Sequence, residues 1–171
     1  AKAIADALRV NGSLTALDLY YNPIGAEGAK AIADALRVNG SLTSLNLREN
    51  AIGAEGAKAI ADALRVNGSL TCCNVLRNEM DEAAVRSLVE AVKDKNISLC
   101  GIKPDQTEAD FYGRGLKPPD AILLASDLSK AGVSGSLKRL LVGSSMIRDK
   151  GCIALAEAMQ QNESCKIEEL G

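Results

Sequence analysis

The chain has 171 residues, a formal net charge of −2 and 47% hydrophobic residues, so we expect one domain with a sizeable apolar core. The near-neutral charge argues against nucleic acid and anionic membrane as partners, because both need a basic field. The sequence has no histidine and no Gly-rich phosphate loop, so we expect no enzyme, no cofactor and no metal site.

The chain begins with three copies of one segment. AKAIADALRVNGSLT occupies residues 1–15, 29–43 and 57–71, and the full units 1–28 and 29–56 differ at only five positions. A fixed period of this length indicates one supersecondary unit stacked on copies of itself.

A short strand is expected near the end of each copied segment. In the first unit Leu14, Leu17, Leu19 and Asn22 spell L-x-x-L-x-L-x-x-N, the pattern of leucine-rich repeats. Leucines at every second residue predict a strand with one side turned inward, and the asparagine can bond backbone groups of the turn and of the next coil. The pattern recurs at Leu42, Leu45, Leu47 and Asn50, and in softer form at Leu70, Cys73, Val75 and Asn78.

A helix is expected over residues 26–38. Its inward stripe consists of Ala29, Ile32, Ala33 and Leu36. Its outward face carries Glu27, Lys30, Asp34 and Arg37, which can pair along the helix. We expect Asn39 and Gly40 to end the helix, with the glycine in the left-handed conformation.

A unit of 28 residues with such a helix resembles the ribonuclease-inhibitor-like leucine-rich repeat family, which includes repeat domains of NOD-like receptors, related protist proteins and the GTPase-activating protein of Ran. The resemblance implies an α/β leucine-rich repeat solenoid over residues 1–171, curved, with parallel strands on the concave side and helices on the convex side.

After Asn78 the sequence no longer matches the repeated unit closely. We expect a helix over 81–93, an irregular loop insertion near 99–106, and a strand over 107–112. In that repeat Ala109, Phe111, Arg114 and Leu116 take the Leu, Leu, Asn and Ile positions. The remaining expected elements are a helix over 119–130, a strand motif at Leu137, Leu140, Val142 and Ser145, a helix over 149–161 and a strand start at 167–170. With no polar capping repeat at either end, we expect a fragment of a longer array and self-association through its uncapped ends.

The five cysteines predict reduced thiols and a cytoplasmic location, because they lack paired spacing and one replaces a core leucine. They are Cys72, Cys73, Cys100, Cys152 and Cys165.

The expected function is binding of a protein partner on the concave strand face, by residues between the inward leucines. Four of the five differences between the first two units fall there: Ala16/Ser44, Asp18/Asn46, Tyr20/Arg48 and Tyr21/Glu49. All three tyrosines of the chain also lie there, and tyrosine and arginine are enriched in binding hot spots. The candidate partner-binding residues are Asp18, Tyr20, Tyr21, Asn46, Arg48, Glu49, Asn74, Leu76, Arg77, Asp110, Tyr112, Arg139 and Leu141.

Two alternatives remain open from the sequence. The first is a regulatory domain of the GTPase-activating type, to which Arg48, Arg77 or Arg139 could contribute. The second is a purely structural scaffold array. The acidic residues Asp105, Glu108 and Asp110 are interpreted as a solvated surface rather than an acid pair or a cation site.

Overall fold

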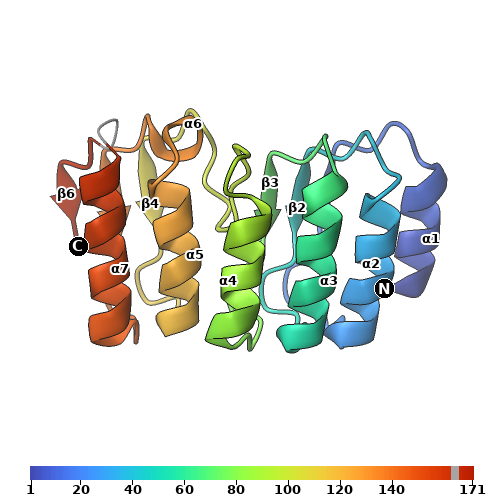
Figure 1. Ribbon diagram of the computed structural model, residues 1–171, viewed down its shortest axis with the longest axis horizontal. Coiled ribbons are helices and arrows are strands. Elements are labelled where there is room, and N and C mark those ends of the chain that lie inside the picture. Colours follow the sequence, from blue (N-terminus) through green and yellow to red (C-terminus); the bar gives the residue numbers. More distant parts are fainter. Residues whose placement is uncertain (163–165) are drawn as a thin grey trace.

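The computed structural model describes residues 1–162 and 166–171, and it places the helices in one row with the strands in a second row beside them (Figure 1). The helices are α1 Lys2–Val10, α2 Gly25–Leu36, α3 Gly53–Val66, α4 Glu82–Ala91, α5 Pro118–Leu128, α6 Ala131–Ser134 and α7 Arg148–Gln161. The strands are β1 Ala16–Asp18, β2 Ser44–Asn46, β3 Cys72–Asn74, β4 Glu108–Asp110, β5 Arg139–Leu141 and β6 Glu169–Leu170. The strand–helix alternation agrees with that expected from the sequence, apart from the short α6, which was not predicted.

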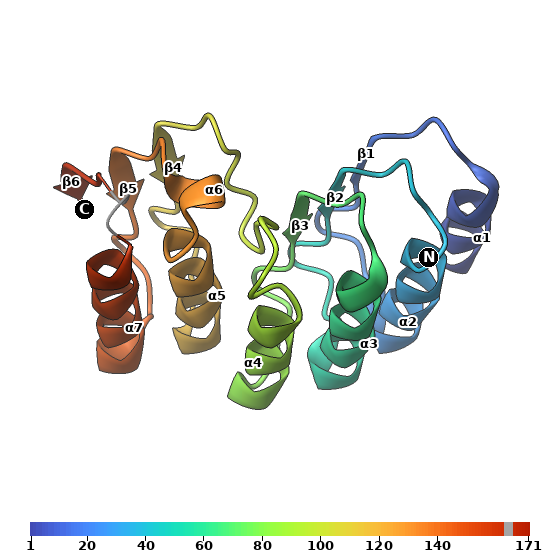
Figure 2. The ribbon, with the colours of Figure 1, turned by 45° about the horizontal axis from the view of Figure 1, so that its top comes forward.

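The strands form two separate parallel sheets rather than one continuous sheet. The first has the order β1-β2-β3 and the second β4-β5-β6. In the first sheet the 28-residue period sets the register, since Leu17 pairs with Leu45 and Leu45 with Cys73. In the tilted view of Figure 2 all the strands lie along one side of the helices.

The interruption lies in the stretch expected to be an irregular insertion. Ser98 forms a parallel bridge with Cys72, and the carbonyls of Ser98 and Leu99 accept hydrogen bonds from the N–H groups of Cys73 and Val75, at 2.8 and 3.0 Å. Residues 98–100 are therefore an additional pass through the strand layer, which was not predicted from the sequence. No helix occurs between this pass and β4 within the described residues 98–107. Every other coil between β1 and β6 has its own helix.

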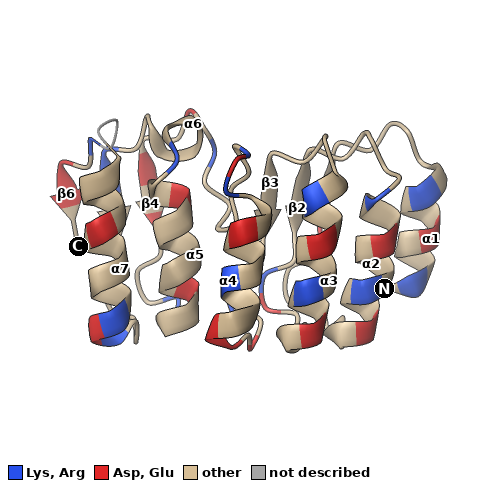
Figure 3. Cartoon of the chain, in the orientation of Figure 1, with Lys and Arg blue, Asp and Glu red and all other residues tan. Residues whose placement is uncertain are grey.

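The core lies between the two layers. The inward residues Ala29, Ile32, Ala33 and Leu36 of α2 are all buried, as expected, and so are Leu45 and Leu47 of the second coil. The helices pack closely because small residues face one another. A Cβ atom at Gly56 would lie only 2.9 Å from the Cβ of Ala29. The helix side carries charges of both signs (Figure 3), including Lys30, which pairs with Glu27 at 2.8 Å and with Glu55 at 2.6 Å.

Where the chain leaves α2, the backbone groups are bonded by the Asn39 side chain. The expected left-handed cap at Gly40 is therefore wrong. Gly40 is not among the residues with positive φ. Instead the Asn39 Oδ1 accepts the N–H groups of Ser41 and Leu42, at 3.1 and 2.8 Å. The Asn39 Nδ2 donates to carbonyl oxygens of the preceding coil, those of Leu8 and Asn11. One buried amide thus satisfies four backbone groups.

A second asparagine ladder follows the strands. The Asn50 Nδ2 donates to the carbonyls of Leu19 and Arg48, at 2.8 and 3.0 Å, while its Oδ1 accepts the N–H of Asn22 at 3.1 Å. Asn78 repeats the arrangement one coil later, donating to Leu47, Val75 and Leu76 and accepting from Asn50. The bonds to the turn were predicted from the repeat, but these side chains reach the preceding coil rather than the next one as expected.

The ladder does not continue into the next coil as expected. Arg114, expected in the asparagine position, is exposed, and its guanidinium lies 5.9 Å from the centre of the Phe111 ring. The apolar positions of that coil are assigned correctly, since Ala109, Phe111 and Leu116 are buried. An arginine cannot replace the asparagine because it has donors but no acceptor.

Candidate functional site

The strand side carries a row of Asp and Asn side chains at equivalent register positions. Asp18, Asn46, Asn74 and Asp110 each follow the central residue of a strand. Each uses Oδ1 to accept the backbone N–H two residues later, at 2.8, 3.1, 3.2 and 2.8 Å respectively. This is the Asx-turn arrangement, which bends the chain as it leaves the strand. These four candidates for partner binding therefore also stabilise the turn.

The next row contains Tyr20, Arg48 and Leu76, which are spaced by the repeat period and differ in exposure. Tyr20 is 45% exposed, Arg48 is half-buried and Leu76 is 1% exposed. The expectation that Leu76 points outward is therefore wrong. The Arg48 guanidinium lies 5.1 Å from the Tyr20 ring centre, a cation–π contact that holds both side chains.

The irregular stretch after α4 lies close to β3. Gly101, with φ +86°, approaches Asn74 so closely that an added Cβ would lie 2.9 Å from its Nδ2. Ile102, in the same stretch, is buried like Leu76. Nothing in the repeat pattern signals the burial of Leu76, since Tyr20 and Arg48 at the equivalent positions are more exposed.

The third row, Tyr21, Glu49 and Arg77, lies where the backbone is left-handed. Their φ angles are 54°, 56° and 57°, a region that non-glycine residues seldom adopt. The strain is offset by hydrogen bonds to the next coil. The Tyr21 N–H donates to the Arg48 carbonyl and the Glu49 N–H to the Leu76 carbonyl, both at 3.1 Å.

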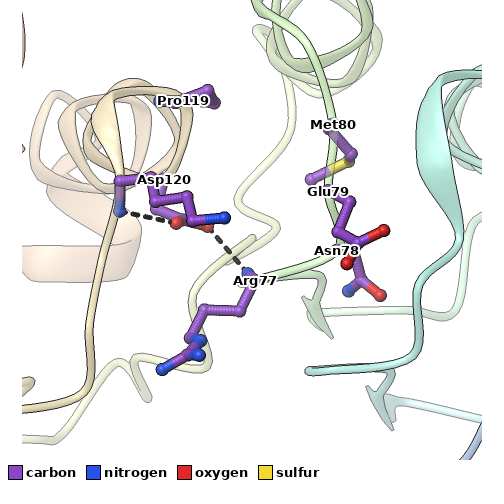
Figure 4. Close-up of a pocket in the computed structure, with 7 residues that line it drawn as sticks. Arg77, Asn78, Glu79, Met80, Pro119 and Asp120 are labelled. Carbon is purple, nitrogen blue, oxygen red and sulfur yellow. Dashed lines mark hydrogen bonds between the residues drawn. The ribbon is translucent and has the colours of Figure 1, made fainter.

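At Arg77 the next coil supplies a carboxylate in place of a carbonyl. The Arg77 N–H donates to Asp120 Oδ1 at 2.7 Å, and the other oxygen of Asp120 accepts the Lys117 N–H at 2.9 Å. Figure 4 shows the carboxylate beside the Arg77 backbone, in a pocket also lined by Asn78 and Pro119. Asp120 is itself buried in the first turn of α5. Its charge is therefore used to hold the first sheet to the second half of the chain.

Three of the four charged candidates of the first sheet form one ion-paired cluster. Arg48 Nη2 lies 2.7 Å from Glu49 Oε1, and Arg77 Nε lies 3.7 Å from the same oxygen. The Glu49 side chain is only 17% exposed. The sequence predicted these residues as separate contacts, but the fold brings the two arginines to one carboxylate.

The second sheet repeats part of this layout. Asp110 and Tyr112 take the places that Asp18 and Tyr20 have in the first sheet, and Tyr112 is 64% exposed. Arg139 lies between Glu108 and Glu169, at 3.1 and 2.9 Å. Leu141 is half-buried and carries no charge.

A hollow of about 370 Å³ lies over the first sheet. Its lining residues are Ala16, Leu17, Asp18, Ser44, Leu45, Asn46, Cys72, Asn74, Gly101 and Lys103. Lys103 was expected in a loop, and nothing in the sequence pattern connected it with this surface. It reaches the hollow because the chain passes β3 once more before β4. The Lys103-Pro104-Asp105 segment predicted the loop. The surface that the loop contacts is determined by the additional strand pass, which was not predicted.

Three of the four cysteines that the structure describes are shielded from solvent, wholly or in part. Burial raises the pKa of the Cys72, Cys73 and Cys100 thiols, which keeps them protonated. Cys152 is exposed, and Cys165 lies outside the described residues. Among the described residues no group of acidic or sulfur side chains could hold a metal ion, and no helix is long and apolar enough to cross a membrane.

Comparison with known proteins supports a leucine-rich repeat family. Residues 10–33 and 38–61 match a family model described as Leucine Rich repeat. No curated protein matches the sequence. Among solved structures, the chain is similar to leiomodin-1 actin-binding site 2, with a TM-score of 0.52, 15% identity, and coverage of 98% of this chain and 75% of that one. It is also similar to the tropomodulin C-terminal domain of Caenorhabditis elegans, with a TM-score of 0.50, 12% identity, and coverage of 99% and 80%. At these identities the likeness concerns the fold.

Proposed function

We propose that the chain is a protein-interaction module whose strand face binds a protein partner. The strand face comprises Asp18, Tyr20, Tyr21, Asn46, Arg48, Glu49, Asn74, Arg77, Asp110, Tyr112, Arg139 and Leu141. One observation carries the proposal. The first two units are identical along their helices, which are also solvent-facing, yet four of their five differences lie on the strand side.

The exposed aromatic residues support this face. Tyr20, Tyr21 and Tyr112 are 45%, 74% and 64% exposed. Rigid, amphipathic rings of this kind dominate binding energies when a partner covers them. Tyr20 is already ordered by Arg48, which reduces the entropy that binding would cost.

The arginines favour binding over the GTPase-regulating alternative. Arg48 and Arg77 share Glu49, and Arg139 lies between two glutamates. An arginine that enters the active site of another protein would first have to leave these ion pairs. The geometry supports a contact surface better than a catalytic finger.

The same proposal includes three finer features. We place the chain in the ribonuclease-inhibitor-like subclass because a helix backs each 28-residue unit. We take the strand side as concave because helices are wider than strands. We place the protein in the cytoplasm because its described cysteines are free thiols.

The test is affinity capture with matched variants. Tyr20→Ala/Tyr21→Ala/Tyr112→Ala removes the aromatic contacts, and the control Lys30→Glu/Asp34→Lys/Arg37→Glu alters only the helix side. We expect a partner retained by the wild type and the control to be lost from the tyrosine variant. Purified actin is one defined probe, since one structural neighbour is an actin-binding site of leiomodin-1. Loss confined to the helix-side variant would overturn the proposal.

A further inference from the structure

The helix side contains a groove that the strand-face function does not use. It has a volume of about 330 Å³ and lies among α4, α5 and α7. Its apolar lining includes Pro118, Pro119 and Ile122 of α5. The only charged residues of α5, Asp120 and Asp127, are buried, so this helix presents no charge to the groove.

One wall of the groove is a stripe on α7 formed by Lys150, Ile153, Ala154 and Glu157. These positions are related as i, i+3, i+4 and i+7, so they lie on one face of the helix. Ile153 is 57% exposed, so more than half of its surface is open to a partner. The stripe therefore has an apolar centre with a cation at one end and an anion at the other.

The two charged residues of the stripe make only one long ion pair with other described residues of the chain. The Lys150 side chain is 85% exposed, and its nearest carboxylate, that of Glu82, lies 3.9 Å away. Glu157 is exposed and has no ion pair among the described residues. Lys150 and Glu157 lie at equal distances along the sequence from the midpoint between Ile153 and Ala154.

This arrangement is self-complementary. If two copies of α7 lie antiparallel across a two-fold axis at that midpoint, each Lys150 faces the Glu157 of the other copy. Each Ile153 then lies against the Ala154 of the other copy. A two-fold contact requires one patch to match itself, and the charge order of the stripe meets that condition. We propose that two copies of this chain associate through the α7 stripe.

The interface is independent of the strand face, which lies on the other layer. The stripe comprises four residues, whereas a stable interface has about 20–30 on each side, so the association is expected to be weak and concentration-dependent. Opposite charges at both ends fix the antiparallel register more than they add affinity.

The test is the oligomeric state of charge-swapped variants, measured by sedimentation velocity over a concentration series. A reducing agent excludes disulfide dimers through the exposed Cys152. Lys150→Glu alone and Glu157→Lys alone should each bring like charges together and abolish dimers. The double variant Lys150→Glu/Glu157→Lys should restore them, because it reverses both ends of the stripe.

Two controls separate the stripe from general surface effects. Ile153→Arg should abolish dimers, whereas Val66→Arg on α3, which alters a residue of similar exposure (63%), should not. Lys58→Glu, also on α3, should behave as the wild type. The proposal is overturned if the wild type stays monomeric to its solubility limit, if the single reversals leave dimers intact, or if the double variant fails to restore them. Circular dichroism of each variant verifies that the fold is retained.

Discussion

The hydroxyl of Ser98 donates a 2.6 Å hydrogen bond to the buried carboxylate of Asp127, and this contact joins the two halves of the chain. Asp127, on α5, also accepts the N–H groups of Leu99 and Cys100, at 2.8 and 3.0 Å. These are the residues of the additional pass through the strand layer. Asp127 therefore anchors the additional pass to α5, and Asp120 on the same helix anchors the turn at Arg77.

Removing the Asp127 carboxylate should destabilise the fold. Asp127→Ala leaves three buried donors without an acceptor, and each unsatisfied group costs about 1–3 kcal/mol. We expect the free energy of unfolding in urea to fall by several kcal/mol. Asp34→Ala, at an exposed site on α2, should change it by less than about 0.5 kcal/mol. Equal unfolding midpoints for the two variants would contradict the role assigned to Asp127.

The same carboxylate predicts a pH dependence of known sign. Burial raises the pKa of Asp127 above its ordinary value of 3.8, although its hydrogen bonds act in the opposite direction. The folded chain therefore holds the Asp127 proton more tightly than the unfolded chain does. The resulting stabilisation is complete below the unfolded pKa and is lost as pH rises through the folded pKa. Relative to Asp127→Asn, the wild type should be most favoured in acid and lose that advantage toward neutral pH, as followed by urea unfolding at several pH values.

The buried leucine at the centre of β2 should matter more than any surface residue. Leu45 is 0% exposed, so Leu45→Ala should leave a cavity and cost about 2–5 kcal/mol. Lys58→Ala on the exposed side of α3 should cost less than about 0.5 kcal/mol. A denaturant series on both variants measures the difference, and a similar cost for both would disprove the register.

The strand-end asparagine ladder should be sensitive to loss of its amide. Asn50→Ala removes two donated bonds and one accepted bond, all at buried or half-buried backbone groups. The expected cost is about 1–3 kcal/mol, set by the Asn22 N–H, because the carbonyls of Leu19 and Arg48 keep donors in the Asn22 side chain and the Tyr21 N–H. Hydrogen exchange should accelerate at Asn22 first, because its N–H loses its acceptor. Unchanged exchange there would show that the ladder carries no local stability.

Lys95 should act as an asparagine substitute. It lies 28 residues after Asn67, and its Nζ donates to the carbonyls of Leu64, Arg65 and Asn67. Lys95→Met keeps the aliphatic stem but loses these bonds, which should cost about 1–3 kcal/mol. Lys95→Asn should recover much of that loss, since Asn67 satisfies the preceding coil in the same manner. Equal thermal midpoints for the Met and Asn variants would contradict the substitution.

The repeat made most of the fold predictable, because the copied units specify both layers locally. Leu45 and Ile32 could be assigned to the core from periodicity alone, and the asparagines from their fixed place after the strand. The failures occur where distant residues intervene. Gly40 was expected to cap a helix that Asn39 ends through bonds to Leu8 and Asn11 of the preceding coil.

The candidate site was predictable only in outline. The rows of side chains follow from strand alternation, but Leu76 is buried where the alternation predicts an exposed residue. Arg77 depends on Asp120, which lies 43 residues away, and Lys103 reaches the hollow by an additional strand pass. Contacts of this kind depend on tertiary packing and have no local pattern.

The additional pass at 98–100 affects how the two sheets face a ligand. A helix occupies about 10 Å across the row and a strand about 4.8 Å, and this mismatch bends a stack of coils. A strand pass without a helix reduces the mismatch at that point, so we expect the bend to relax between β3 and β4. A rigid ligand shaped to the surface of one sheet would then not match the other. Tyr20 and Tyr112 would contact separate segments of a partner, joined by a flexible connection.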